Sequence, residues 1–490
     1  MATFTMRRLR LHTSQVKTLR ASSLAEGLRS ALGHLFRIAV SFSLLFMDNT
    51  ILMVAVLLAR LRPADRHQAL SNDGQPYPKT MLITGIGTSH GLALARAWKA
   101  EGHRVVGADV VDLDLPIRSG GSMSRTLVAF YQVPTDHYIS KILEIIQREE
   151  IDLWVPCSPR VTAIEDATAR QVVESRTICK CIAFDADLVA CFVRPDSFKH
   201  FLVERDLPVL EHFQVQSRDS IHKILHRTPA KSYRLSSGGS ESAVSLPKRT
   251  LSRTYSEISE LNISKENPWT LQQQNRLGEF FADLLVIQGH VQAIKVRLAG
   301  TRSPHWGASR LDEALAAAIH RLMQSFASKV GPRMTGHLSV RLLVDEESDI
   351  SSVRHTIYIG DCISGAAAFN NLLRNAPCPV SGYLAALDSA PTEPPAWKVM
   401  ATLSPNKPPW LTLLDNNFVA HLLPYSNTVK HAITSLEGTL EPFLFWVNPR
   451  FSYLDPVPWW WHVHVYQPLR EIWMLVKQTR AAFLAGYFDD

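Results

Sequence analysis

The 490-residue sequence predicts an α/β protein whose folded part begins with a doubly wound parallel sheet. The first observation is the stretch from Lys79 to Val111, where an apolar run ends at a glycine turn and is followed by a helical pattern and a second apolar run. A strand, turn, helix and strand of this kind form a right-handed crossover between parallel strands. The second observation is that strand and helix patterns keep alternating as far as Phe184, which is typical of a small parallel sheet.

The remaining elements follow from the spacing of apolar residues. Apolar runs predict strands at 127–131, 151–156 and 177–184, and helical periodicity predicts helices at 138–150, 161–174 and within 185–203. The stretch 119–122, which reads SGGS, is expected to be a flexible loop. Farther on, the sequence predicts a hairpin of 283–287 and 291–298 joined by Gln288-Gly289, a helix at 311–330, and strands at 338–344 and 356–359 separated by an acidic turn at 345–349.

The glycine turn raises the question of a cofactor. Gly85, Gly87 and Gly91 would let the backbone approach a pyrophosphate at a helix N-terminus, and Asp109 stands where a ribose-binding carboxylate would be. The spacing G-x-G-x-x-x-G also occurs in units that bind no dinucleotide. A short-chain dehydrogenase would in addition need a Tyr-x-x-x-Lys pair, and no tyrosine here has a lysine four residues later. An NAD(P)-dependent oxidoreductase is therefore only a minor alternative.

The composition excludes some classes of partner. The 52 basic and 45 acidic residues give a net charge of +7, and much of this excess lies before residue 67. No basic patch interleaved with aromatic residues follows, so we expect no nucleic-acid partner. The six cysteines show no paired C-x-x-C spacing, which indicates buried free thiols in a reducing compartment.

An N-terminal segment indicates attachment to a membrane. A basic leader precedes an apolar run at about 38–59, which is long enough to span a bilayer, and Pro63 to Pro78 is typical of a linker. Asp48, Asn49 and Thr50 would then lie near the bilayer centre, where a carboxylate is costly. A re-entrant hairpin with Asp48 and Asn49 at its tip is the competing interpretation, and a buried core helix and a mitochondrial presequence are further alternatives. We expect a membrane-associated protein with its main domains in the cytoplasm.

Two later segments have an unusual composition. Serines dominate from Pro229 to Asn267, which predicts a mobile surface loop, with a glycine-rich flap over nucleotide phosphates as the functional alternative. The C-terminal segment opens with PWWW at 458–461 and continues with aromatic and aliphatic residues among basic ones. It fits either a membrane interface or an aromatic helix packed on a domain. His462 and His464 are two residues apart and lie on different sides of a helix, so we do not expect them to bind a metal together.

The order of segments is distinctive over nearly the whole chain. After the leader come KTMLITG and LALARAWKAEGHRVV, then FYQVP, ILEIIQREEIDLWVPCSP and CIAFDADLVACF, then ISKENPW, TGHLSVRLL and the closing YLDPVPWW. This series resembles the ATP-grasp ligases of the mycosporine-glycine synthetase type, which act in natural-product pathways. The FDAD and DPVP segments are its most specific parts.

The resemblance implies an ATP-grasp-like fold preceded by a Rossmann-like, pre-ATP-grasp domain. It divides the chain into a leader, membrane segment and linker (1–75), a pre-ATP-grasp α/β domain (76–190), an ATP-grasp-like domain (191–400) with a Ser-rich loop (229–267), and an aromatic C-terminal extension (401–490). Members of this family use ATP and Mg²⁺ to activate a carboxylate or enol that an amine then attacks. The implied partners are a small-molecule acid, an amine and another enzyme of the pathway.

The resemblance also implies where the nucleotide and metal residues lie. The family's lysine at a strand end corresponds to Ser236, its acidic residue after the Pro-Trp segment to Gln273, a strand aspartate to Arg341, and the asparagine of its magnesium-binding segment to Asp361. Gln273 can still accept from the adenine amino group, and Asp361 alone keeps an oxygen ligand for the metal. One carboxylate rarely holds magnesium between two phosphates.

Other side chains are candidates to compensate for these losses. Arg341 is the candidate catalytic residue, because a cation at that position could take over part of the metal's charge-neutralising role. The candidates for ATP or phosphate binding, besides Gln273, are Lys199, Lys231, Ser236, Gly238 and Gly239.

The first domain would help to hold the other substrate. Its candidate pocket residues are Gly85, Gly87, Thr88, Ser89 and His90. Two functions therefore remain close to parity. One is an ATP-grasp-type ligase that joins an acid or enol to an amine, and the other is a catalytically dead pseudoenzyme that acts as a membrane-tethered scaffold.

Overall fold

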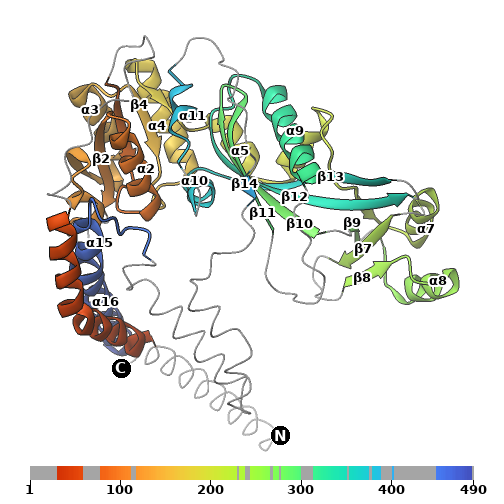
Figure 1. The fold of residues 1–490 in the computed structure, drawn as a ribbon. Helices are drawn as coiled ribbons and strands as arrows, with labels where there is room; N and C mark the ends of the chain where they lie inside the picture. Colours follow the sequence, from red (N-terminus) through yellow and green to blue (C-terminus); the bar gives the residue numbers. More distant parts are fainter. Residues whose placement is uncertain are drawn as a thin grey trace, which may run out of the picture. The chain divides into compact units, whose positions relative to one another are not determined.

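The computed structural model describes residues 30–58, 78–111, 117–228, 231–237, 243–264, 269–274, 278–298, 313–349, 352–374, 378–387, 400–401 and 448–487. The chain forms two compact units (Figure 1). The first comprises residues up to Arg160 and those from Lys407 onward, and the second runs from Val161 to Asn406. The first contains a parallel sheet and the second contains antiparallel sheets, so the predicted combination of α/β and α+β structure is confirmed.

The parallel sheet of the first unit has the strand order β3-β2-β1-β4. Its strands are β1 (Thr80–Thr84), β2 (Arg104–Val111), β3 (Leu127–Pro134) and β4 (Leu153–Pro156). The accompanying helices are α2 (Ser89–Ala100), the short η2 (Thr135–His137) and α3 (Tyr138–Glu149). Every residue of β1 is buried, as expected for a strand with a neighbour on each side, and so is every residue of β4.

The glycine turn between β1 and α2 depends on close backbone packing. Gly85 has φ +84°, and a Cβ atom there would lie 2.7 Å from backbone atoms of Cys157, at the end of β4. Only glycine meets both conditions without strain. Thr88 then caps α2, because its hydroxyl accepts from the Gly91 N–H at 3.0 Å.

The expected flexible loop at 119–122 is instead a buried turn. Gly120 and Gly121 are buried, and they begin a short 3₁₀ helix, η1 (Gly120–Met123). A Cβ atom on Gly121 would overlap the carbonyl oxygen of Ile86, and one on Gly120 would overlap that of Pro458. Glycine is needed here because other backbone segments approach closely. A glycine-rich composition alone does not show whether the glycines serve close packing or a flexible loop.

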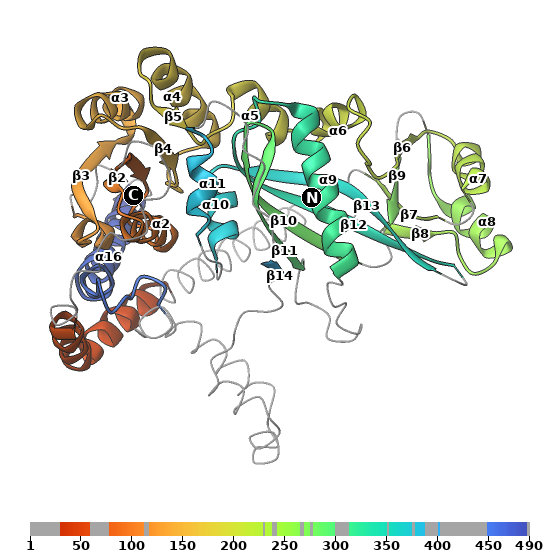
Figure 2. The ribbon, with the colours of Figure 1, turned by 45° about the horizontal axis from the view of Figure 1, so that its top comes forward.

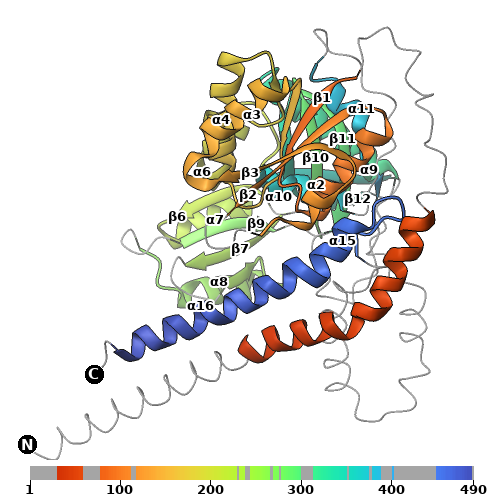
Figure 3. The same cartoon turned by 90° about the vertical axis from the view of Figure 1, so that its left-hand side faces the viewer.

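Two helical segments from opposite ends of the chain pack side by side in the first unit (Figure 3). One is the continuous helix Ser30–Leu58, and the other consists of α15 (Val457–Trp461), a π-helical turn η4 (His462–Tyr466) and α16 (Gln467–Tyr487). Their contacts run antiparallel, from Ser30 with Gln478 to Asn49 with Trp460.

The predicted re-entrant hairpin at Asp48 and Asn49 is wrong, because the helix continues through both residues. Asp48 pairs with His464 at 2.9 Å, and the Trp460 indole N–H donates to Asn49 at 2.8 Å. These partners pair one carboxylate oxygen of Asp48 and the side-chain oxygen of Asn49, whereas the other oxygen of Asp48 is buried without a hydrogen-bond partner among the described residues. The helix has 29 residues and a mean hydropathy of 1.9 in its most apolar window, and is thus long and apolar enough to cross a membrane.

The second unit begins with helices and a small antiparallel sheet. The helices are α4 (Ala163–Arg176), α5 (Ala186–Val193) and α6 (Pro195–Val203), and the predicted strand at 177–184 is reduced to β5 (Lys180–Cys181). The small sheet has the order β6-β9-β7-β8, with strands β6 (His212–Val215), β7 (Ser232–Ser237), β8 (Ala243–Leu246) and β9 (Trp269–Gln274). The helices beside it are α7 (Arg218–Arg227) and α8 (Leu251–Glu260).

The mobile loop predicted for the Ser-rich segment is wrong for its described part. That part forms β7, β8 and α8, and its apolar residues Tyr233, Leu235, Leu246 and Ile258 build a small core. The serines lie between these core positions and outnumber them in the composition. Gly238 and Gly239 fall outside the described residues.

The large sheet has the order β13-β12-β10-β11-β14, and α9 lies against it (Figure 2). Its elements are β10 (Gly278–Ile287), β11 (His290–Leu298), α9 (Glu313–Val330), β12 (Gly336–Asp349), β13 (Ser352–Ser364), α10 (Ala366–Leu373), α11 (Val380–Leu384) and β14 (Met400–Ala401). The predicted hairpin is confirmed, with Gln288 and Gly289 both at positive φ. The expected acidic turn at 345–349 is wrong, because these residues extend β12 and pair with β13.

Candidate functional site

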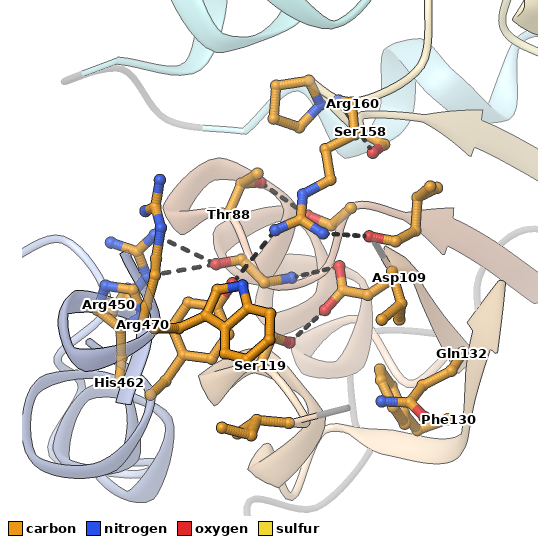
Figure 4. Close-up of a pocket in the computed structure, with 18 of the residues that line it drawn as sticks. Thr88, Asp109, Ser119, Phe130, Gln132, Ser158, Arg160, Arg450, His462 and Arg470 are labelled. Atoms are coloured by element: carbon orange, nitrogen blue, oxygen red, sulfur yellow. Dashed lines mark hydrogen bonds between the residues drawn. The ribbon is translucent and has the colours of Figure 1, made fainter. Parts of the chain in front are cut away.

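A cavity of about 480 Å³ lies in the first unit, where β1, β2, β3 and β4 end (Figure 4). Gly85 and Gly87 come from the turn after β1, Asp109 from β2, Gln132 from β3 and Ser158 from the residues after β4. The carboxyl ends of parallel strands are where ligands bind in open α/β sheets. The opposite wall comes from the C-terminal segment, with η4 and α16.

Asp109 holds the glycine turn closed. One carboxylate oxygen accepts from the Gly87 N–H at 2.9 Å, and the other accepts from the Ser119 hydroxyl. Burial raises the pKa of Asp109, while these hydrogen bonds and nearby arginines lower it. Both oxygens are thus engaged within the chain, so the geometry gives the dinucleotide interpretation of Asp109 no support.

Two arginines are held at fixed positions in the cavity wall. Arg450 donates to the Gly87 carbonyl from two nitrogens, at 3.2 and 3.4 Å. Arg160 donates to the Val110 carbonyl at 3.0 Å and to the Tyr466 hydroxyl at 3.4 Å. Burial lowers the pKa of Arg450 to about 10, so this residue is still a cation at neutral pH.

His462 lies between the arginines and remains neutral. Burial is the main cause that lowers its pKa well below the usual value, and the charges of Arg450 and Arg470 act in the same direction. Its ring stacks on Tyr466, with centroids 5.5 Å apart. His462 therefore contributes a polar but uncharged surface to the cavity.

The described lining of the cavity is strongly cationic. Arg160, Arg450, Arg470 and Lys477 face a single carboxylate, Asp109. Charges of one sign in a cleft with low-dielectric walls attract a ligand of the opposite sign. The cavity is therefore suited to an anion.

The structure brings some of the predicted pocket residues together and leaves others out. Gly85, Gly87 and Thr88 line the cavity, whereas Ser89 and His90 are not among its described lining residues. The four basic side chains were not predicted as site residues. The signal for two of them, Arg470 and Lys477, was present only as a helical spacing, because Tyr466, Arg470, Trp473 and Lys477 recur on one face of the C-terminal helical segment.

A second polar cluster lies in the second unit, where the small sheet meets β13. Lys231 donates to Glu211 at 2.7 Å, and the Tyr233 hydroxyl donates to the other oxygen of Glu211 at 2.9 Å. Burial opposes ionisation of Glu211, but these two hydrogen bonds lower its pKa below the usual value. Lys231, a predicted phosphate ligand, is thus ion-paired.

Gln273 is buried beside this cluster. Its Nε2 donates to the Tyr358 hydroxyl at 3.3 Å. Its Oε1 is buried, and within the described part of the chain no donor reaches it. Such an orphaned acceptor needs an explanation, and a bound donor group is one. The position fits the adenine amino group that was expected there.

Arg341 and Asp361, predicted as catalytic residue and metal ligand, contact each other directly. Arg341 Nε donates to Asp361 at 2.7 Å, and its Nη1 lies 3.5 Å from Glu279. A metal bound to Asp361 would lie close to this guanidinium, and two positive groups at that distance repel each other. Both described carboxylates here, Asp361 and Glu279, already contact Arg341, so this arrangement does not fit Mg²⁺, and adenine binding at Gln273 stays a prediction.

The remaining predicted residues lie on separate elements. Lys199 is half-buried on α6, whose apolar face packs into the main core of the second unit. Ser236 lies on β7, paired with Thr270 of β9 and Ala243 of β8. Their roles in phosphate binding stay predictions.

No protein-family model matches the chain, and no curated protein matches it either. Among solved structures it is similar to the biotin carboxylase domain of a thermophilic 2-oxoglutarate carboxylase bound to ADP, at 10% identity over 66% of this chain and 71% of that one, with a TM-score of 0.45. It is also similar to the biotin carboxylase of Campylobacter jejuni (13% identity, 64% and 71%, TM-score 0.40). A third similar structure is N5-carboxyaminoimidazole synthetase from Staphylococcus aureus complexed with ADP (12% identity, 59% and 70%, TM-score 0.34).

Proposed function

We propose that this chain is an ATP-grasp-type protein that binds an adenine nucleotide in its second unit without transferring a phosphoryl group. It would act as a membrane-tethered partner of another enzyme in a secondary-metabolite pathway. The observation that carries the proposal is the 2.7 Å ion pair between Arg341 and Asp361. These are the two positions at which the resemblance implies the metal-dependent chemistry.

Phosphoryl transfer requires cations that are free to neutralise charge on the phosphates. Arg341 shares its charge between Asp361 and Glu279. Asp361 in turn is neutralised before any metal arrives. The pair therefore competes with a metal for Asp361 and with the phosphates for Arg341.

Nucleotide binding is supported by Gln273 and its surroundings. An amide oxygen that is buried without a donor costs free energy, which a ligand's N–H group would recover. The neighbouring Lys231, Glu211 and Tyr233 form a fixed polar wall next to it. No step beyond binding follows from these contacts.

The cationic cavity of the first unit favours a second candidate, an active ligase. Four basic side chains would bind the carboxylate or enolate of an acid substrate, and a small-molecule amine would be the second substrate. This candidate requires the Arg341–Asp361 pair to open when Mg²⁺ and ATP bind. Release of ADP in the presence of acids and amines would support it.

The helix Ser30–Leu58 supports the membrane part of the proposal, with the main domains on the cytoplasmic side. It exposes large apolar side chains, among them Phe42, Phe46 and Met53, which are 66%, 83% and 73% exposed. Apolar surface of this extent on a soluble helix is unfavourable in water. A bilayer would cover it.

Nucleotide binding is tested by the melting temperature of the detergent-solubilised full chain with ATP alone. We expect ATP to raise the melting temperature, because a ligand at 100 times its Kd adds about 2.7 kcal/mol to the free energy of unfolding. Gln273→Leu should abolish the increase. Gln272→Leu is the matched control, because Gln272 is the exposed neighbour on the same strand. An unchanged melting temperature for the wild-type chain would contradict nucleotide binding.

A further inference from the structure

We infer that the cavity of the first unit binds a single-chain amphiphile with an anionic head group, such as a long-chain carboxylate, which it receives from a membrane surface. The inference goes beyond the proposed function, since it concerns the first unit and needs no nucleotide. Three features carry it: the cationic wall, an apolar wall beside it, and the apolar surfaces of the two helical segments next to the cavity.

The cationic wall is suited to a compact anionic head. Arg450 and Arg160 are each fixed through a backbone carbonyl, and Arg450 keeps its positive charge at neutral pH. Arg470 adds a more exposed charge from α16, and among the described residues neither it nor Arg450 forms an ion pair with a carboxylate. Guanidinium groups bind carboxylate and phosphate oxygens through paired N–H donors. One head group could therefore contact two or three of these side chains.

The rest of the wall is apolar. Trp473 and Met474 from α16 lie across from Phe130 on β3 and Ile117 in the loop before η1. Cavities of several hundred Å³ with apolar walls and a few placed polar groups are typical small-molecule sites. A wholly polar anion would leave this apolar surface uncovered, whereas an alkyl chain would cover it.

The spacing along α16 places an exposed apolar stripe beside the cavity. Leu469, Ile472 and Val476 are 39%, 44% and 50% exposed. Each is the residue just before one that lines the cavity, namely Arg470, Trp473 and Lys477. Neighbouring residues lie about 100° apart around a helix, so the two stripes adjoin along its length. A membrane that covers the apolar stripe would therefore reach the rim of the cavity.

The seam between the helix Ser30–Leu58 and the C-terminal segment combines polar pairs with an apolar cluster, in which Val40, Leu44 and Ile51 pack against Trp459 and Val463. It joins His34 and Arg37 to Glu471, Ser41 and Asp48 to His464, and Ser30 to Gln478. The large apolar side chains of the helix, such as Phe46 and Met53, face outward instead. Polar groups that pair within the interface, together with large apolar side chains that face outward, are expected in an apolar medium.

The test uses the full chain reconstituted in phosphatidylcholine nanodiscs and 9,10-dibromostearate as the probe. The chain has eleven tryptophans, so quenching is measured in the wild type and in Trp473→Phe, and the part of the quenching that this variant loses reports occupancy of the cavity. We expect Arg470→Gln to raise the half-quenching concentration about tenfold, and Arg450→Gln to raise it at least as much. Arg470 is exposed, so its substitution separates loss of binding from loss of folding. Arg480→Gln, on the same helix but outside the cavity lining, is the matched control and should leave the value unchanged.

Two comparisons identify the source of the ligand. The methyl ester of the probe has the same chain without the charge, and it should quench at least tenfold more weakly. Inorganic phosphate should not displace the probe at concentrations that leave the nanodisc intact. Equal quenching by the ester, with no effect of Arg470→Gln, would show that only membrane partitioning is measured and would overturn the inference. Full displacement by phosphate would overturn it in favour of a soluble anion. Neither result depends on ATP, so this test and that of nucleotide binding can fail separately.

Discussion

His337 on β12 shows how burial fixes the charge of a single residue. It is buried, its Nε2 lies 2.8 Å from the Tyr383 hydroxyl, and its ring packs edge-on against Phe369. Burial lowers the pKa of His337 to about 3. The folded chain therefore keeps this imidazole neutral at a pH where the unfolded chain would protonate it.

This difference predicts how stability depends on pH. The pKa of His337 in the folded chain lies below its value of about 6.5 in the unfolded chain. The contribution of His337 to the free energy of unfolding is therefore complete above pH 6.5 and is lost as the pH falls. We expect the free energy of unfolding to decrease by about 1 kcal/mol more between pH 6 and pH 5 in the wild type than in His337→Gln, whose amide does not titrate. Urea unfolding at the two pH values measures this. An equal change in both proteins would contradict a neutral buried imidazole.

At the same scale, the sequence predicted residues whose role depends on their neighbours along the chain. Helical spacing after the glycine turn places Leu92, Ala95 and Trp98 on one face, and these residues are buried on α2. The contact between Arg341 and Asp361 could not be predicted from spacing, because the two residues lie on different strands and meet only after β12 and β13 pair. Side-chain pairing across a sheet depends on register, which composition does not specify.

At the scale of elements, one carboxylate attaches the C-terminal segment to the parallel-sheet domain. Asp455, in the DPVP segment, is 4% exposed and lies 3.1 Å from Arg96 on α2. It also accepts from the Ser124 hydroxyl at 2.6 Å and from the Arg125 N–H at 3.2 Å. These contacts attach the segment from which η4 and α16 form one wall of the cavity.

Replacement of Asp455 should therefore weaken the first unit. Removing one partner of a buried ion pair costs about 3–5 kcal/mol, because the other charge stays buried. We expect Asp455→Ala to reduce the free energy of unfolding by about that amount, as measured by chemical denaturation. Glu204→Ala, which removes an exposed acid, should change it by less than about 1 kcal/mol. A loss that small for Asp455→Ala would show that the segment is held by other contacts.

The elements themselves were predicted where local chemistry decides their form. Gln288-Gly289 indicated the hairpin of β10 and β11 because both residues must adopt positive φ. The Ser-rich segment was predicted wrongly, because the serines on β7 and β8 concealed a core of alternating apolar residues. The re-entrant hairpin failed for another reason, since the partner of Asp48 lies 416 residues away.

At the scale of the whole molecule, function depends on residues that the sequence separates widely. Arg450 contacts Gly87 across 363 positions, and with Arg160 it makes the cavity cationic. Sequence patterns located the glycine turn but could not predict which side chains would face it. The polar cluster at Gln273 likewise needs β9 and β13 to meet before Tyr358 can accept its hydrogen bond.

The central claim is that the chain binds nucleotide but does not use Mg²⁺ for chemistry. It is tested most directly by titrating the full chain with ATP calorimetrically, with Mg²⁺ and with EDTA, and by assaying ADP in the same samples. Because Arg341 already neutralises Asp361, the Kd for ATP should be the same within about twofold in both conditions, with no ADP formed. A Kd at least tenfold lower with Mg²⁺, accompanied by ADP release when acids and amines are added, would contradict the claim and support the ligase.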